Sequence, residues 1–64
     1  MHSLRVYYPG SLVAEAVRSA LKAEEAIALI RDLLAEHDGC ERVEVYVSGN
    51  RLFAVDCKGN RIPG

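Results

Sequence analysis

Two alternating apolar segments around a glycine-containing turn constrain the fold of this chain more than any other feature. The stretch VEVYVSGNRLFAVD, residues 43–56, has apolar side chains at nearly every second position on both sides of Gly49-Asn50. Such alternation around a short turn is typical of a β-hairpin. The pattern predicts two antiparallel strands, over 42–47 and 52–57, with Gly49-Asn50 at the turn.

The position of the turn predicts which side chains share a face. If Gly49 and Asn50 are the two central turn residues, Val45 lies opposite Ala54, and opposed residues share a face. One face then carries only apolar side chains: Val43, Val45, Val47, Leu52 and Ala54. The other face carries Tyr46, Phe53, Val55 and Cys57 among Arg42, Glu44 and Arg51. A one-residue slip in register would exchange the two faces.

The N-terminal third predicts a first strand and leaves the next segment open. Leu4, Val6 and Tyr8 alternate with polar neighbours, which places them on one face and Tyr7 on the other. Pro9-Gly10 then suits a type II turn. The following segment, LVAEAVRS (12–19), fits either a returning strand or the start of a helix. We favour a strand, because a helix from residue 12 to residue 37 would be about 39 Å long at 1.5 Å per residue.

The segment 22–37 has the apolar spacing of an amphipathic helix. Its apolar positions recur at intervals of three and four residues: Ala23, Ile27, Ile30 and Leu34, with Ala26 and Leu33 beside them. Glu24 and Glu25 favour the positive end of the helix dipole, and Gly39 is a typical helix stop. We expect this helix to pack on the purely apolar face of the hairpin.

Together these elements predict a single α+β domain over residues 1–64. The expected order is ββαββ, or βαββ if 12–19 is helical, with an antiparallel sheet and one helix on one of its faces. A domain of this size buries only about 60% of the surface that its unfolded chain exposes. Association with another chain is one way for such a domain to gain buried area.

Charge and hydropathy exclude several functional classes. Eight basic and nine acidic residues give a net charge of −1, so no global field draws the chain to nucleic acid. The apolar runs are too short to span a bilayer. The first ten residues, MHSLRVYYPG, lack the regions of a signal peptide. We therefore expect a cytoplasmic protein that does not enter a membrane.

The nucleophilic and metal-ligating side chains form no recognisable catalytic or metal motif. His37, Cys40 and Cys57 are of the types that zinc binds, but they include no CxxC pair. Cys40 also follows a helix C-terminus, which disfavours a thiolate. Without a secretory signal, the two cysteines are expected to be reduced. We expect no enzymatic activity, no metal and no cofactor.

The second face of the sheet is the main functional lead, because no second helix is available to cover it. Either long Arg and Glu side chains drape over its aromatic rings, or it is an interface with aromatics at the centre and charges at the rim. We favour an interface with a protein partner or with a second copy of the chain, as a homodimer. The predicted interface residues are Tyr7, Arg42, Tyr46, Arg51, Phe53 and Val55.

Two further functional expectations concern this face and the order of elements. A single-stranded nucleic acid could stack on the aromatic rings, although Glu44 and the acidic helix oppose phosphate. The segments RVYYPGSLVAEAV, KAEEAIALIRDLLAEH and VEVYVSGNRLFAVDCKGN give an element order that resembles small phage-encoded inhibitors of the anti-CRISPR type. The resemblance implies a non-enzymatic inhibitor that blocks a bacterial defence complex by occupying its surface. A housekeeping homodimer is compatible with the same architecture.

Overall fold

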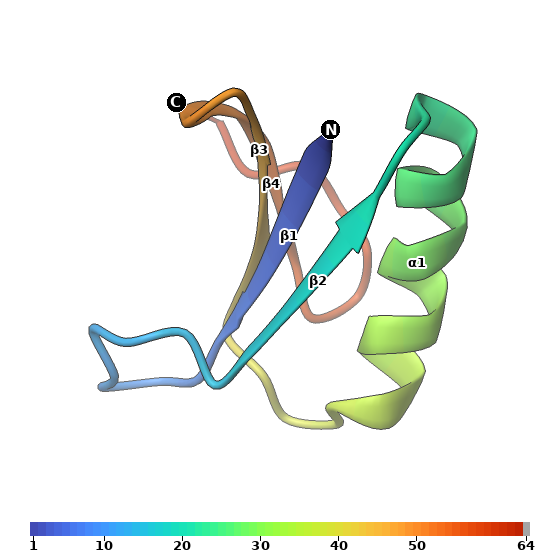
Figure 1. Ribbon diagram of the computed structural model, residues 1–64. Helices are drawn as coiled ribbons and strands as arrows, with labels where there is room; N and C mark the ends of the chain where they lie inside the picture. Colours follow the sequence, from blue (N-terminus) through green and yellow to red (C-terminus); the bar gives the residue numbers. More distant parts are fainter. Residues whose placement is uncertain (64) are drawn as a thin grey trace.

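A computed structural model describes residues 1–63 as four strands and one helix (Figure 1). The elements are β1 (His2–Tyr7), β2 (Ala16–Ala20), α1 (Ala23–Glu36), β3 (Arg42–Val47) and β4 (Asn50–Asp56). The strands form one antiparallel sheet in the order β2-β1-β3-β4, and α1 lies against one face of it. The predicted α+β fold with the order ββαββ is confirmed.

The segment whose structure the sequence left open divides into a loop and a strand. Gly10 has φ 81, and Ser11 N–H donates to the Tyr8 carbonyl at 3.1 Å, as the predicted type II turn requires. The chain does not pair with β1 directly after this turn. Pairing begins at Glu15, whose N–H donates to the Val6 carbonyl of β1. We call residues 8–15 the β1–β2 loop. It projects from the sheet on the side away from α1 (Figure 1).

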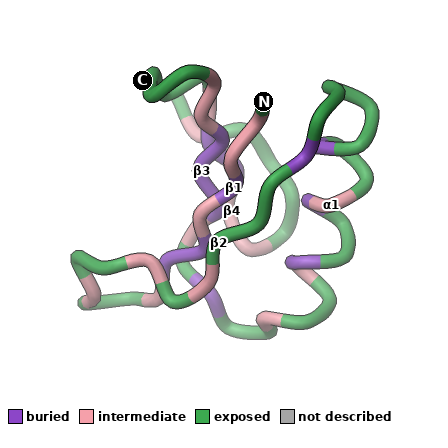
Figure 2. The backbone as a smooth tube through the Cα atoms, in the orientation of Figure 1, coloured by how far each residue is buried: buried purple, intermediate pink, exposed green. Residues whose placement is uncertain are grey.

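The core lies between α1 and the sheet face that β1 and β3 present to it (Figure 2). Leu4 pairs with Val45, and Val6 pairs with Val43. These side chains and those of Ala26, Ile30 and Leu33 are buried. The predicted helix stripe is therefore rotated, because Ile27 is 56% exposed. The rotation follows from where the helix packs, which is mainly over β1 and β2.

The β3–β4 hairpin differs from the predicted register in two ways. Val47 pairs with Asn50, so the turn is centred on Ser48 and Gly49, which have φ 51 and 81. Positive φ at both central residues is the type I′ geometry that matches strand twist. Near the turn, each β3 residue therefore pairs two positions away from its predicted β4 partner. Because side chains alternate between the faces with a period of two, this shift leaves them on their predicted faces.

The second difference is a β-bulge, and it does exchange faces. Tyr46 pairs with Arg51, whereas Val45 pairs with Phe53, so Leu52 is an extra residue in β4. Beyond the bulge, Phe53 turns toward the helix side, because a bulge shifts the alternation by one residue. The predictions that Phe53 and Val55 lie on the outer face, and Leu52 and Ala54 on the helix face, are wrong. The bulge brings a phenylalanine and a valine to the helix side in place of a leucine and an alanine, which increases the apolar surface beside the core.

The segment that follows β4 doubles back along that strand. The Asp56 carboxylate accepts from the N–H groups of Lys58 and Asn60, both at 2.9 Å. Ile62 N–H then donates to the Ala54 carbonyl at 2.9 Å, and Arg61 forms a bridge with Val55. The free edge of β4 is thus partly paired. Gly64 lies outside the described residues.

We predict that two leucine truncations distinguish the bulged register from the expected one. Leu33→Ala should lower the free energy of unfolding by about 3 kcal/mol, because it empties a fully buried position. Leu52→Ala should lower it by less than about 1 kcal/mol, because Leu52 is 57% exposed. Chemical denaturation of both variants measures this. Equal losses would mean that Leu52 faces the helix and that the bulge is absent.

Candidate functional site

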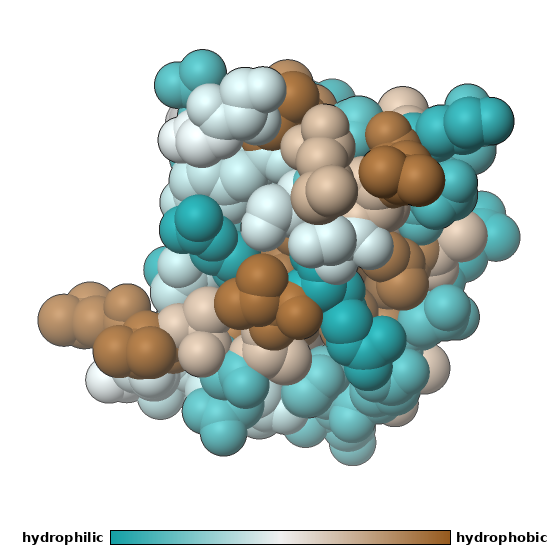
Figure 3. Space-filling view, in the orientation of Figure 1, coloured by the Kyte–Doolittle hydropathy of each residue, from teal (hydrophilic) through white to brown (hydrophobic). Residues whose placement is uncertain are grey.

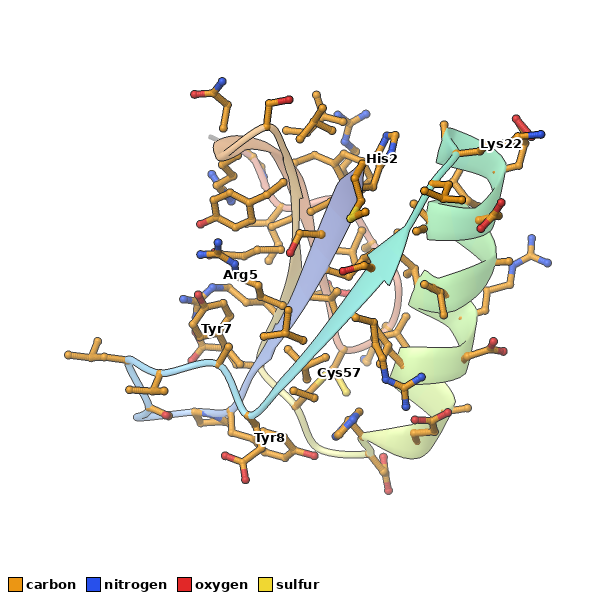
Figure 4. The ribbon with its side chains drawn as sticks, in the orientation of Figure 1. His2, Arg5, Tyr7, Tyr8, Lys22 and Cys57 are labelled. Atoms are coloured by element: carbon orange, nitrogen blue, oxygen red, sulfur yellow. The ribbon has the colours of Figure 1, made fainter. Side chains whose placement is uncertain are left out.

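The outer face of the sheet, the side turned away from α1, carries stacked cationic and aromatic side chains. The guanidinium carbon of Arg5 lies 4.0 Å from the ring centroid of Tyr46. That of Arg42 lies 4.3 Å from the ring centroid of Tyr7. Figure 4 shows Arg5 and Tyr7 on this side. Because the ring faces are negative and attract guanidinium groups, arginines of the same chain partly cover both tyrosines.

Glu44 connects the tyrosine and arginine side chains of this face. Its carboxylate accepts from Arg42 Nε at 2.8 Å and from the Tyr46 hydroxyl at 2.8 Å. Burial by itself would raise the pKa of Glu44, but these two hydrogen bonds outweigh burial, and the pKa lies below its usual value. Arg42 also pairs with Glu41. The carboxylate is therefore held ionised inside a charge-assisted network.

The structure separates the six residues predicted to form an interface. Tyr7 and Tyr46 lie on the outer face, each opposite an arginine in the ladders, Arg42 and Arg51 respectively. Phe53 and Val55 are turned to the helix side by the bulge, as described above. The six residues do not form one surface. Arg5 and Arg42 stack on the two tyrosine rings of the outer face, which agrees with the alternative expectation for these two rings.

Exposed apolar side chains are concentrated along another part of the chain. Among residues 1–63, the large exposed hydrophobic residues are Met1, Leu12, Val13, Val17, Leu21, Ile27 and Leu52. Four of these seven lie within residues 12–21, and we call them the β2 stripe: Leu12, Val13, Val17 and Leu21. Figure 3 shows apolar atoms at the end of the projecting β1–β2 loop. Leu12 is 96% exposed and Val13 is 73% exposed.

The tip of the β1–β2 loop is held in a defined backbone path. The Ser11 hydroxyl donates to the Val13 carbonyl at 2.9 Å and accepts from the Val13 N–H at 3.3 Å. The Tyr8–Ser11 turn lies before it and the Glu15–Val6 hydrogen bond after it. Such side-chain turns substitute for secondary structure in a loop. The two most exposed apolar side chains are therefore presented on an ordered support.

The stripe continues onto a strand whose outer edge is open. Among the described residues β2 pairs only with β1, in a regular ladder without a bulge. The backbone groups on the other edge of β2 are therefore accessible to another strand. Val17 lies on the outer face because it pairs with Arg5. None of these residues is among the predicted interface residues, although Leu12-Val13 directly after Pro-Gly-Ser is a signal in the sequence, since loop residues are commonly polar.

The thiols and the potential metal ligands lie together without forming a metal centre. Within residues 1–63, no group of three or more His, Cys, Asp or Glu side chains is placed to hold a metal ion. Cys40 and Cys57 are both free thiols, and Cys57 lies between the sheet and the helix (Figure 4). Burial, and then the neighbouring Cys57 thiol, raise the pKa of Cys40 to about 11. The Cys40 thiol is thus a weak nucleophile near neutral pH.

Comparison with known proteins finds no match to this chain among family models, curated proteins or solved structures. Within residues 1–63, no helix is both long enough and apolar enough to cross a membrane.

We predict that the Glu44 network makes stability depend on pH in the acidic range. Because the folded pKa of Glu44 is lowered, its contribution is fully present above the unfolded value of about 4.3 and is lost as the pH falls through the folded pKa. Glu44→Gln should therefore lower the free energy of unfolding by about 1 kcal/mol at neutral pH and by much less in acid. Denaturant unfolding across the acidic range measures both values.

Tyr46→Phe is the matched control for this prediction, because it removes one hydrogen-bond donor and keeps the ring. It should reduce the acid dependence only in part. A difference between Glu44→Gln and the wild type that stays constant across the acidic range would contradict the network.

We also predict that Cys40 resists alkylation in the folded chain. At near-neutral pH its thiolate fraction is lower by at least about tenfold than that of an exposed cysteine, whose pKa is about 8.5. Peptide mapping after iodoacetamide treatment should show slow labelling of Cys40 in the native chain and fast labelling in denaturant. Equally fast labelling in both states would show that the Cys40 site opens readily.

Proposed function

We propose that this chain is a non-catalytic protein-binding module that contacts its partner through the β2 stripe and the open edge of β2. The observation that carries the proposal is the ordered loop that leaves most of the Leu12 and Val13 side chains in solvent. Loops of this kind often carry function on a rigid support. Here the support is the β1–β2 ladder, with one projecting apolar tip.

The free energy of burying the stripe favours a partner with an apolar pocket. Burying one exposed leucine or valine side chain contributes about 1.5–3 kcal/mol. Leu12 and Val13 lose little conformational freedom on binding, because their backbone is already ordered by Ser11. Binding energy is therefore concentrated at two neighbouring side chains, as in other interfaces with few dominant contacts.

The open edge of β2 adds a second source of affinity. A strand from a partner can pair with an exposed edge, and its backbone hydrogen bonds are independent of sequence. Proline, bulges and unpaired charges commonly block such pairing. β2 contains no proline and no bulge, and its one charge, on Arg18, is paired with Glu36 of α1 at 3.1 Å. The edge is thus suited to accept a strand.

The outer face is a weaker candidate for the same role. Its tyrosine rings are stacked against Arg5 and Arg42 of the same chain, and Glu44 places a negative charge among them. A nucleic acid would have to displace these arginines before its bases could stack. We therefore favour a protein partner, either a second copy or a foreign protein. Inhibition of a bacterial complex, which the element order implies, would be one use of such binding.

We predict that the double variant Leu12→Ser/Val13→Ser weakens association at least about tenfold, equivalent to 1.4 kcal/mol, without lowering the melting temperature. The matched control is Leu52→Ser, which changes an exposed leucine outside the stripe. Self-association is measured by sedimentation of the pure chain over a wide concentration range. A foreign partner is identified by a photo-cross-linking residue at position 12 or 17, with position 52 as the control.

A partner that cross-links from positions 12 and 17 but not from 52, and that the double variant fails to bind, supports the proposal. The proposal fails if the pure chain is monomeric and no protein cross-links selectively from the stripe. It also fails if Leu52→Ser weakens association as much as the double variant does.

A further inference from the structure

A groove on the helix side of β4 is separate from the β2 stripe. Because α1 packs mainly over β1 and β2, the helix-facing side of β4 is only partly covered. The space between α1 and β4 has a volume of about 420 Å³. Its apolar lining consists of Ile27, Ile30, Leu34, Phe53 and Val55. Small-molecule sites in proteins commonly range from about 300 to 1,000 Å³, so this groove has the size of a small-ligand site.

The groove is bounded at one end by the turn that follows β4. Lys58 and Gly59 of this turn line the groove beside Leu34. A Cβ atom placed on Gly59 would lie 3.6 Å from Leu34 Cδ1, which is ordinary van der Waals contact. The turn is itself held by the Asp56 carboxylate, whose hydrogen bonds to the backbone of Asn60 and Lys58 lower its pKa despite partial desolvation. The groove thus has a structured end.

The charged side chains that line the groove are both cationic. They are Arg31 and Lys58, and among residues 1–63 no carboxylate lines the groove with them. Neither forms an ion pair with another residue in the described part of the chain. On α1, the residues three and four positions from Arg31 are Ile27, Ala28, Leu34 and Ala35, so no acidic neighbour on the helix is placed to pair with it. Lys58 lies near enough to Asp56 for its charge to help lower the pKa of that carboxyl, but its ammonium forms no ion pair with it. The site combines an apolar lining with two cationic side chains.

We propose that this groove binds a small amphiphile with one apolar chain and an anionic head, of the class of medium-chain carboxylates. The apolar chain lies against Ile27, Leu34 and Phe53, and the carboxylate interacts with Arg31 and Lys58. The groove volume of about 420 Å³ lies at the small end of the range for small-molecule sites, so a ligand with one alkyl chain of about ten carbon atoms is a suitable probe.

The β4 edge argues against an extended peptide as the occupant. Part of that edge is already paired with the C-terminal segment, through Asp56 N–H to Asn60 and Ile62 N–H to Ala54. A peptide strand in the groove would place its N–H and C=O groups against aliphatic and aromatic side chains, which cannot satisfy them. An alkyl chain needs no such partners. A helix from another protein satisfies its own backbone groups. It is therefore the competing occupant, and the experiment must distinguish it from an alkyl chain.

The test uses the full chain and three ligands with the same alkyl chain: decanoate, decanol and decyltrimethylammonium, each below its aggregation limit. Binding is followed by NMR shifts of the methyl groups of Ile27, Ile30, Leu34 and Val55. We expect saturable one-to-one binding of decanoate, at least tenfold weaker binding of decanol, and no binding of the cation. Inorganic phosphate alone should not shift these methyl groups.

Charge variants test the head-group site. Arg31→Gln and Lys58→Gln change exposed side chains, so both variants should fold, and each should weaken decanoate binding several-fold while leaving decanol unchanged. Lys22→Gln, which removes a cation outside the groove, is the matched control and should have no effect. Leu12→Ser/Val13→Ser should also bind decanoate normally, because this proposal does not depend on the β2 stripe.

Three results would overturn the proposal. Equal affinity for decanol and decanoate, unchanged by Arg31→Gln or Lys58→Gln, would show an apolar groove without a head-group site. Methyl shifts that require micelles or anionic phosphatidylglycerol vesicles would indicate adsorption to an aggregate or a membrane surface. Concentration-dependent shifts of the same methyl groups without ligand, and no response to decanoate, would show that protein association fills the groove.

Discussion

The bulge at Leu52 determines what each side of the sheet presents. Without it, Phe53 would stay on the same face as Tyr46, and the helix side of β4 would contain Ala54 instead. With one extra residue, β4 presents Arg51 to the outer face before the bulge and Phe53 to the helix side after it. The apolar groove on the helix side, to which Phe53 and Val55 contribute, depends on this single insertion.

The outer face and the helix side of the sheet differ in how their apolar surface is covered. On the outer face, Arg5 and Arg42 stack on tyrosine rings, and Glu44 is held by hydrogen bonds at 2.8 Å. The charges of Arg42 and Glu44 are thus paired with each other within the chain. On the other side, one fourteen-residue helix is too narrow to cover four strands, and it packs over β1 and β2. The uncovered part of β4 is thus a consequence of having a single helix in a short chain.

The β2 stripe differs from the rest of the described surface because all four of its apolar side chains are more than half exposed. Leu12 and Val13 lie on a loop that hydrogen bonds hold away from the sheet, and Val17 follows on an open edge strand. In so small a domain, apolar groups this exposed oppose solubility and do not contribute to the core. Their exposure is the observation that supports the binding role proposed above.

Local patterns in the sequence determined the helix within one residue at each end, the turn at Pro9-Gly10, and the core positions Leu4, Val6, Val43 and Val45. These follow from periodicity and from the conformations that proline and glycine permit, both of which are local properties. Only the tertiary structure decided the faces of β4, because Phe53 turns inward to meet a helix far away in sequence. It also decided which rings the arginines cover and which edge of the sheet stays open. Those outcomes depend on which elements become neighbours, and alternation along one strand carries no information about its neighbours.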